Sequence, residues 1–250
     1  MSTTWVLLRG LMREQRHWGN FPAQLAQALP DATIVTPDLP GNGQQYRIDS
    51  ATRVAQTVEF CRQDLLARGL APPYRLLALS LGGMVAAEWA SLYPHELASC
   101  VLINTSMRPF SPFHQRLRWQ NYGALLRQLL RGGQASQEAL ILRLTSTRHR
   151  AGNAELVRQW VAFQQQYPVS RRNALRQLLS AARFRAPASR PGMPLLVLAG
   201  AQDRLVDHRC SLTLAQAWQA DIAVHPEGGH DLPLDQPQWV AQQLARWLQR

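Results

Sequence analysis

The chain has 250 residues, of which 46% are hydrophobic and 17% are charged, and this composition excludes a disordered protein. Its net charge is +11, and all 27 basic residues are arginine. No apolar run approaches the roughly 20 residues of a membrane span, and no basic region precedes the short apolar run at the N-terminus. We therefore expect a cytoplasmic protein with one main domain.

Six short apolar runs predict β-strands, and most of them are apolar throughout, which is typical of strands covered on both faces. Segments with helical spacing of apolar residues lie between most of these runs. The alternation predicts an α/β fold of three layers, in which helices cover both faces of a mostly parallel sheet. The predicted strands are Trp5–Arg9, Thr33–Thr36, Tyr74–Leu79, Ser99–Asn104, Pro194–Ala199 and Ile222–His225, and the predicted helices between and after them are Phe21–Leu29, Thr52–Arg68, Met84–Tyr93, Ser211–Gln219 and Gln238–Leu248.

Residues 107–190 interrupt this alternation, because they contain only helical patterns, separated by glycines and a proline. The sequence therefore predicts a core domain formed by residues 1–106 and 191–250, with an inserted helical cap, or lid, at residues 107–190. The four helical patterns are His114–Arg131, Ser136–Thr147, Ala154–Tyr167 and Arg171–Phe184.

The three cysteines, Cys61, Cys100 and Cys210, are widely separated and form no C-x-x-C pair. Their odd number and spacing argue against a disulfide framework or a zinc site. Each lies in an apolar segment, so we expect buried packing residues.

Ser80 lies where the third predicted strand ends, and Gly82 and Gly83 follow before a helix-forming stretch. A strand, a tight turn and a helix around a serine are typical of a nucleophile elbow, which lifts the hydroxyl above the sheet edge. Ala78 stands where the G-x-S-x-G pattern has its first glycine, and alanine is the next smallest residue. The alternative interpretation is an ordinary loop.

A nucleophilic serine needs a base, and the base needs an orienting acid. Asp203 follows the predicted strand that ends near Gly200, and His230 follows the last strand after two glycines. Asp207 is the better candidate for helix capping, since it directly precedes a helical pattern. The chain order Ser80, Asp203, His230 is that of one known class of Ser-His-Asp enzymes.

These motifs, together with Pro37-Asp38-Leu-Pro-Gly41-Asn-Gly43, resemble the α/β-hydrolase superfamily over nearly the whole chain outside the cap. The chain is most similar to compact capped members: bacterial carboxylesterases, the pimeloyl-carrier-protein methyl ester esterase and C–C bond hydrolases. The resemblance implies a serine hydrolase that cleaves a carboxylic ester or thioester through an acyl-enzyme, without metal or cofactor. An acyltransferase, a C–C bond hydrolase and a non-catalytic ligand- or partner-binding protein are the alternatives.

The resemblance also implies an oxyanion hole formed by the backbone N–H groups of Leu11 and Leu81. Arg9 stands where the family usually has histidine, and it has two interpretations. It either replaces a structural histidine and bonds loop carbonyls, or it faces the pocket and pairs with an anionic substrate group. The candidate substrate-binding residues are Arg9, Trp18, Trp119, Tyr122 and Trp160.

Arginine is concentrated in residues 106–190, which hold 15 arginines and only two acidic residues, Glu138 and Glu155. Three interpretations remain open: a solvated surface, a docking face for an acidic acyl carrier protein like that of the resembled methyl ester esterase, and arginines that bind a substrate anion in the pocket. No nucleic-acid motif is present, and the aromatic residues recur at helical spacing, so nucleic-acid binding is not expected.

Overall fold

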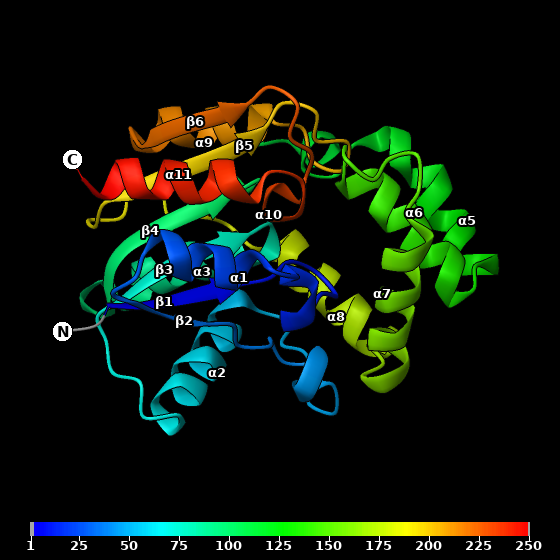
Figure 1. The fold of residues 1–250 in the computed structure, drawn as a ribbon, viewed down its shortest axis with the longest axis horizontal. Helices are drawn as coiled ribbons and strands as arrows, with labels where there is room; N and C mark the ends of the chain where they lie inside the picture. The colour runs from blue at the N-terminus through cyan, green and yellow to red at the C-terminus, as the bar shows by residue number, and fades with distance from the viewer. Residues whose placement is uncertain (1–2, 250) are drawn as a thin grey trace.

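The computed structural model describes residues 3–249, and these form a three-layer α/β fold (Figure 1). All six strands pair in parallel in one sheet, in the order β2-β1-β3-β4-β5-β6. The predicted fold class and all six predicted strands are confirmed. The strands are β1 (Thr3–Leu8), β2 (Ala32–Val35), β3 (Tyr74–Leu79), β4 (Leu97–Ile103), β5 (Leu195–Gly200) and β6 (Asp221–His225).

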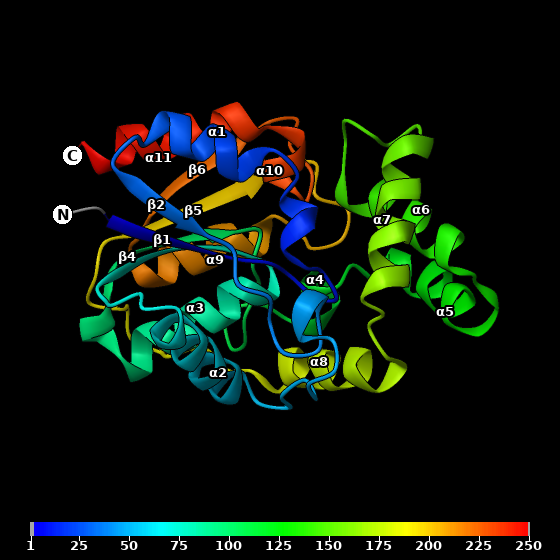
Figure 2. The same ribbon diagram turned by 60° about the horizontal axis from the view of Figure 1, so that its bottom comes forward.

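Successive side chains of each strand point to opposite faces of the sheet, so each face has its own core. Trp5 and Leu7 of β1 belong to the cluster that α1 and α11 cover, whereas Val6 and Leu8 belong to the cluster that α2, α3 and α9 cover. The two groups of helices lie on opposite sides of the sheet in Figures 1 and 2. These helices are α1 (Phe21–Ala28), α2 (Val54–Ala67), α3 (Leu81–Leu92), α9 (Arg209–Trp218) and α11 (Pro237–Leu248).

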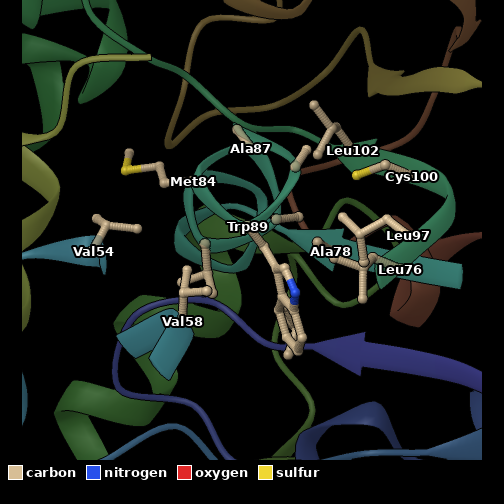
Figure 3. Close-up of a cluster of buried hydrophobic side chains, with 14 of the residues drawn as sticks. Val54, Val58, Leu76, Ala78, Met84, Ala87, Trp89, Leu97, Cys100 and Leu102 are labelled. Atoms are coloured by element: carbon tan, nitrogen blue, oxygen red, sulfur yellow. The ribbon is translucent and has the colours of Figure 1, made fainter. Parts of the chain in front are cut away.

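Helix α3 follows β3 directly, and its residues are almost all buried. Figure 3 shows Trp89 of α3 beside Leu76 and Ala78 of β3, while Met84 of the same helix lies on the side of Val54 of α2. Burial of this much apolar surface, at roughly 25 cal/mol per Å², fixes the position of the turn between β3 and α3.

The chain between β4 and β5, called the insertion below, forms helices that extend beyond the carboxyl ends of the strands (Figure 2). They are α4 (Phe113–Arg116), η4 (Trp119–Asn121), α5 (Tyr122–Arg131), α6 (Gln134–Thr145), α7 (Ala154–Gln166) and α8 (Arg171–Arg183). The expectation of one helix over His114–Arg131 is wrong, because Leu117 is extended and Arg118 is also non-helical. The N–H of Arg118 donates to the carbonyl of Leu205 at 2.9 Å, so a long-range bond interrupts the helix.

Four short elements were not predicted: η1 (Gln15–Trp18), η2 (Gly43–Gln45), η3 (Pro94–Glu96) and α10 (Leu232–Asp235). The predicted burial of the three cysteines is confirmed, and burial raises the pKa of Cys61 and of Cys100 to about 12. Within residues 3–249, every helix is too short or too polar to cross a bilayer.

Candidate active site

Ser80 occupies a strained turn between β3 and α3, with φ 57° and ψ −114°. Positive φ is unfavourable for a residue with a side chain, so the surroundings must hold the turn. The N–H of Ser80 donates to Ile103 at 2.9 Å, and its carbonyl accepts the Thr105 hydroxyl at 2.8 Å. A Cβ on Gly82 would lie 2.4 Å from the Leu8 carbonyl oxygen, so only glycine lets α3 begin this close to β1.

The loop that follows β1 passes directly beside Ser80. A Cβ on Gly10 would lie 3.2 Å from the Cβ of Ser80. The side chains of Leu11 and Leu81, whose N–H groups are the predicted oxyanion donors, belong to the same apolar cluster. The N–H of Met12 donates to Gln177 Oε1 of α8 at 2.9 Å, which ties this loop to the helical insertion.

A small pocket adjoins the elbow on the α2 side. Leu81 is part of its wall, and Gln177 and Ser180 of α8 close it from the insertion. The rest of its wall is partly apolar and comes from Leu39, Pro40, Ser50, Ala51, Val54, Thr57 and Val85.

Asp203 and His230 lie together at the carboxyl ends of β5 and β6. His230 Nδ1 is 2.7 Å from Asp203 Oδ2, and both side chains are buried. The other carboxylate oxygen of Asp203 accepts from the N–H groups of Leu205 and Val206, at 2.8 and 2.9 Å. These bonds fix the carboxylate, so one of its oxygens is directed at the imidazole.

Asn104, immediately after β4, organises the same region. Its Nδ2 donates to the carbonyls of Gly229 and His230, at 2.9 and 2.7 Å, and its Oδ1 accepts from the N–H of Gly200. The sequence predicts only that Asn104 ends a strand. A polar residue that ends an otherwise apolar strand was the available signal for this role.

Asp207 lies one residue before His208, the N-cap of α9, and bonds the first turn of that helix. Its Oδ1 accepts from the N–H of Arg209 at 3.0 Å, and its carboxylate also binds the Arg209 guanidinium. These hydrogen bonds lower the pKa of Asp207 to about 2.

Asp235 links the histidine loop to the insertion. Its carboxylate accepts from the N–H of Gly229 at 3.0 Å, from the N–H of Thr147 at 2.8 Å and from the hydroxyl of Ser146. The N–H of Asp231 adds a bond of 2.8 Å to the carbonyl of Thr145. The end of α6 and the loop that carries His230 therefore share one anchor.

Arg9 is 3% exposed and forms a bidentate ion pair with Asp231, at 3.2 and 2.6 Å. Its guanidinium also lies over the ring of Trp18, 4.6 Å from the ring centre. The structure thus places a carboxylate, rather than loop carbonyls, opposite Arg9, and its charge is balanced within the protein. The pair joins the loop beside Ser80 to the residue that follows His230.

The other predicted substrate-binding residues divide into two groups. Trp18 and Trp160 are each 2% exposed, and Trp160 lies under the Arg13 guanidinium at 4.7 Å. Trp119 and Tyr122 lie on the outside of the insertion, 63% and 39% exposed. The structure does not bring these four side chains into one group.

A cluster of arginines lies beside the backbone of Asp203. The guanidinium of Arg118 donates to the Asp203 carbonyl at 2.7 Å. Burial and the nearby positive charges of Arg150, Arg118 and Arg143 lower the pKa of Arg204. Positive charge is therefore concentrated where the insertion meets the sheet.

Within residues 3–249, no three His, Cys, Asp or Glu side chains are arranged to hold a metal ion.

The sequence from residue 5 to residue 243 matches the model of the alpha/beta hydrolase family. The chain belongs to this family. Over 104 residues, 40% of the chain, it is 32% identical to the biotin biosynthesis bifunctional protein BioHC of Teredinibacter turnerae, and the match spans 17% of that protein's length.

Solved structures share the fold of this alpha/beta hydrolase over its full length. A 2-hydroxy-6-oxo-6-phenylhexa-2,4-dienoate hydrolase from Rhodococcus superposes with a TM-score of 0.79 at 21% identity, covering 100% of this chain and 91% of the other. A thermophilic esterase from Thermogutta terrifontis gives 0.76 at 24% identity, covering 99% and 89%. At these identities the likeness establishes the fold.

Proposed function

We propose that this alpha/beta hydrolase is a serine hydrolase that cleaves a carboxylic ester or thioester. The observation that carries the proposal is the buried 2.7 Å contact between His230 Nδ1 and Asp203 Oδ2, at the same sheet edge as the strained turn of Ser80. A serine in a strained turn and an imidazole oriented by a carboxylate are the parts that nucleophilic catalysis needs.

In the proposed reaction, the Ser80 oxygen attacks the carbonyl carbon while its proton passes to His230 Nε2. The N–H groups of Leu11 and Leu81 stabilise the oxyanion, and loss of one such donor typically costs about 10²–10³-fold in rate. Collapse of the intermediate expels the alcohol or thiol, which takes the proton from His230. Water then attacks the acyl-enzyme with His230 again as base, and the acid and free Ser80 are released.

Labelling with a fluorophosphonate tests the nucleophile. We expect the wild-type protein to be labelled, since an activated serine attacks phosphorus and displaces fluoride, and we expect Ser80→Ala to abolish labelling. Ser106→Ala, which removes another buried serine, is the matched control and should retain the label. An unlabelled wild type would support a non-catalytic binding protein. Label retained in Ser80→Ala would show that another serine is the nucleophile.

The proposed ester chemistry has an alternative on the same residues: acyl transfer or hydrolysis of a C–C bond beside a carbonyl. The Rhodococcus neighbour is a dienoate hydrolase. A panel of p-nitrophenyl esters of increasing acyl length, run beside a dicarbonyl substrate, distinguishes ester cleavage from C–C bond cleavage, and an added alcohol acceptor reveals acyl transfer as a new ester product.

An acidic acyl carrier protein is the second part of this proposal. The arginines Arg118, Arg143, Arg150 and Arg204 favour it, because Arg118 bonds the Asp203 carbonyl, the other positive charges lie near Arg204, and such a group attracts anions. Turnover of an acyl carrier protein ester should fall steeply as salt rises, while turnover of a small neutral ester should not.

A further inference from the structure

Helix α8 buries polar residues and exposes apolar ones, which is the reverse of the usual arrangement. Its buried residues are the polar Asn173, Gln177 and Ser180. Its leucines point outward, with Leu175 61% and Leu178 44% exposed. A helix that packs on a core normally buries its apolar side, so packing within this chain does not account for the exposed leucines.

The polar side of α8 is engaged by the sheet domain. Gln177 accepts from the N–H of Met12 and donates to Asn42 Oδ1 at 2.7 Å, and Asn173 Oδ1 accepts from the N–H of Ser50 at 2.9 Å. Rotating α8 to bury its leucines would leave these buried polar groups unpaired, at a cost of about 1–3 kcal/mol each. The outward direction of the leucines is therefore fixed by the fold.

The outer face of α8 consists of leucine, alanine and arginine. Leu175, Leu178, Leu179 and Ala182 form a continuous apolar stripe along this face, and arginines lie near both of its ends. Arg172 pairs with Asp49 at 2.8 Å. The exposed Arg171 and Arg183 have no carboxylate within 4.0 Å in the described part of the chain, residues 3–249. Figure 2 shows α8 at the edge of the molecule, next to α7.

We propose that the outer face of α8 docks on an anionic phospholipid surface. The leucines enter the boundary between headgroups and acyl chains, and the arginines contact lipid phosphates. This surface binding is separate from the proposed hydrolysis and needs no membrane-spanning helix.

The composition of this face favours lipid over a protein partner. Specific protein interfaces carry about one hydrogen bond per 100–200 Å², and on this face only the arginines can supply them, because every uncharged polar side chain of α8 points inward. A lipid surface requires only apolar and cationic groups. It is also extended and uniformly anionic, which matches the exposed Arg171, Arg172 and Arg183 at the two ends of this face.

Co-sedimentation with vesicles tests the proposal on the whole protein. We expect binding to vesicles of phosphatidylcholine with about one third phosphatidylglycerol, weakened by salt, and little binding to phosphatidylcholine alone. Leu175→Gln, Leu178→Gln and Leu179→Gln together should weaken binding at least about tenfold. Arg171→Gln with Arg183→Gln should weaken it about fivefold per arginine.

Two controls test whether vesicle binding is specific to this face and independent of the proposed hydrolysis. Leu66, Leu92 and Leu212 are exposed leucines outside α8, and their change to glutamine should leave vesicle binding unchanged. Ser80→Ala should bind like the wild type, so failure of the proposed chemistry does not affect this result. Circular dichroism and melting curves establish that each variant is folded.

Absence of binding to the anionic vesicles would overturn the proposal. An equal loss of vesicle binding in the control variant, with Leu66, Leu92 and Leu212 changed to glutamine, would overturn it as well. If the protein instead forms a concentration-dependent dimer and does not bind vesicles, and if the triple glutamine variant of α8 abolishes the dimer, this face is an interface between two copies.

Discussion

At the scale of single residues, Arg9 and Asp231 form the charged pair nearest to the proposed chemistry. Arg9 precedes Gly10, which lies against Ser80, and Asp231 follows His230. Both members of the pair are buried, with a contact of 2.6 Å. Removing one partner of a buried pair leaves an uncompensated charge and typically costs about 3–5 kcal/mol.

We therefore expect Arg9→Met and Asp231→Leu each to lower the free energy of unfolding by about 3–5 kcal/mol. The double variant should lose less than the sum of the two, because it buries no lone charge. Denaturant titration of the four proteins measures the coupling, and strictly additive losses would contradict it.

Arg9→Met should also impair the hydrolysis of anionic and neutral esters alike, whereas a selective rise in KM for anionic esters would restore the substrate-binding interpretation of Arg9.

At the scale of elements, η1 connects the sheet domain to the insertion through a buried histidine. The guanidinium of Arg13 donates to His17 Nε2 at 3.1 Å and to Glu138 of α6 at 2.7 Å. The His17 ring also packs against Trp160 and Phe163 of α7. Since a guanidinium can only donate, Nε2 must accept and the imidazole must be neutral.

Burial and the positive charges of Arg13, Arg9 and Arg16 hold the pKa of His17 well below its usual value. The folded state therefore resists a proton that the unfolded state takes up near pH 6.5, so the contribution of His17 to stability falls as pH drops below about 6.5. The slope approaches about 1.4 kcal/mol per pH unit.

Melting temperatures of wild type and His17→Asn between pH 8 and pH 5 measure this effect. We expect the wild type to lose stability faster than the variant on acidification. Burial raises the pKa of Glu14 and of Asp38 nearby, and their titration acts in the opposite direction in both proteins, so the difference between the two curves isolates His17. Parallel curves would show that His17 does not control the acid response.

At the scale of the whole molecule, the sequence was most informative where one residue type is repeated or required. Apolar runs predicted six strands because burial on both faces of a parallel sheet demands them. Asp203 and His230 could be paired because loops after parallel strands meet at one sheet edge, and the structure places their side chains 2.7 Å apart. Whether Ser80 reacts with their help remains a prediction.

Long-range polar contacts could not be predicted in this way. Asn104, Arg9 and Asp231 meet partners that lie about 100 to more than 200 positions away in the chain, and no local pattern specifies such a partner. The outward direction of the α8 leucines could not be predicted for the same reason, because Gln177 and Asn173 orient that helix through contacts with distant loops. The break at Arg118 arose from its bond to Leu205.

The anchor at Asp235 has a consequence for recombination between relatives. A helical insertion exchanged between two such hydrolases would bring its own Ser146–Thr147 segment, but it would meet the recipient's carboxylate after β6. A chimera that keeps both halves of this contact should preserve the position of the histidine loop, while one that separates them would inherit a new insertion and lose the support of His230. To keep the histidine loop in place, the insertion should therefore be exchanged together with residues 227–235.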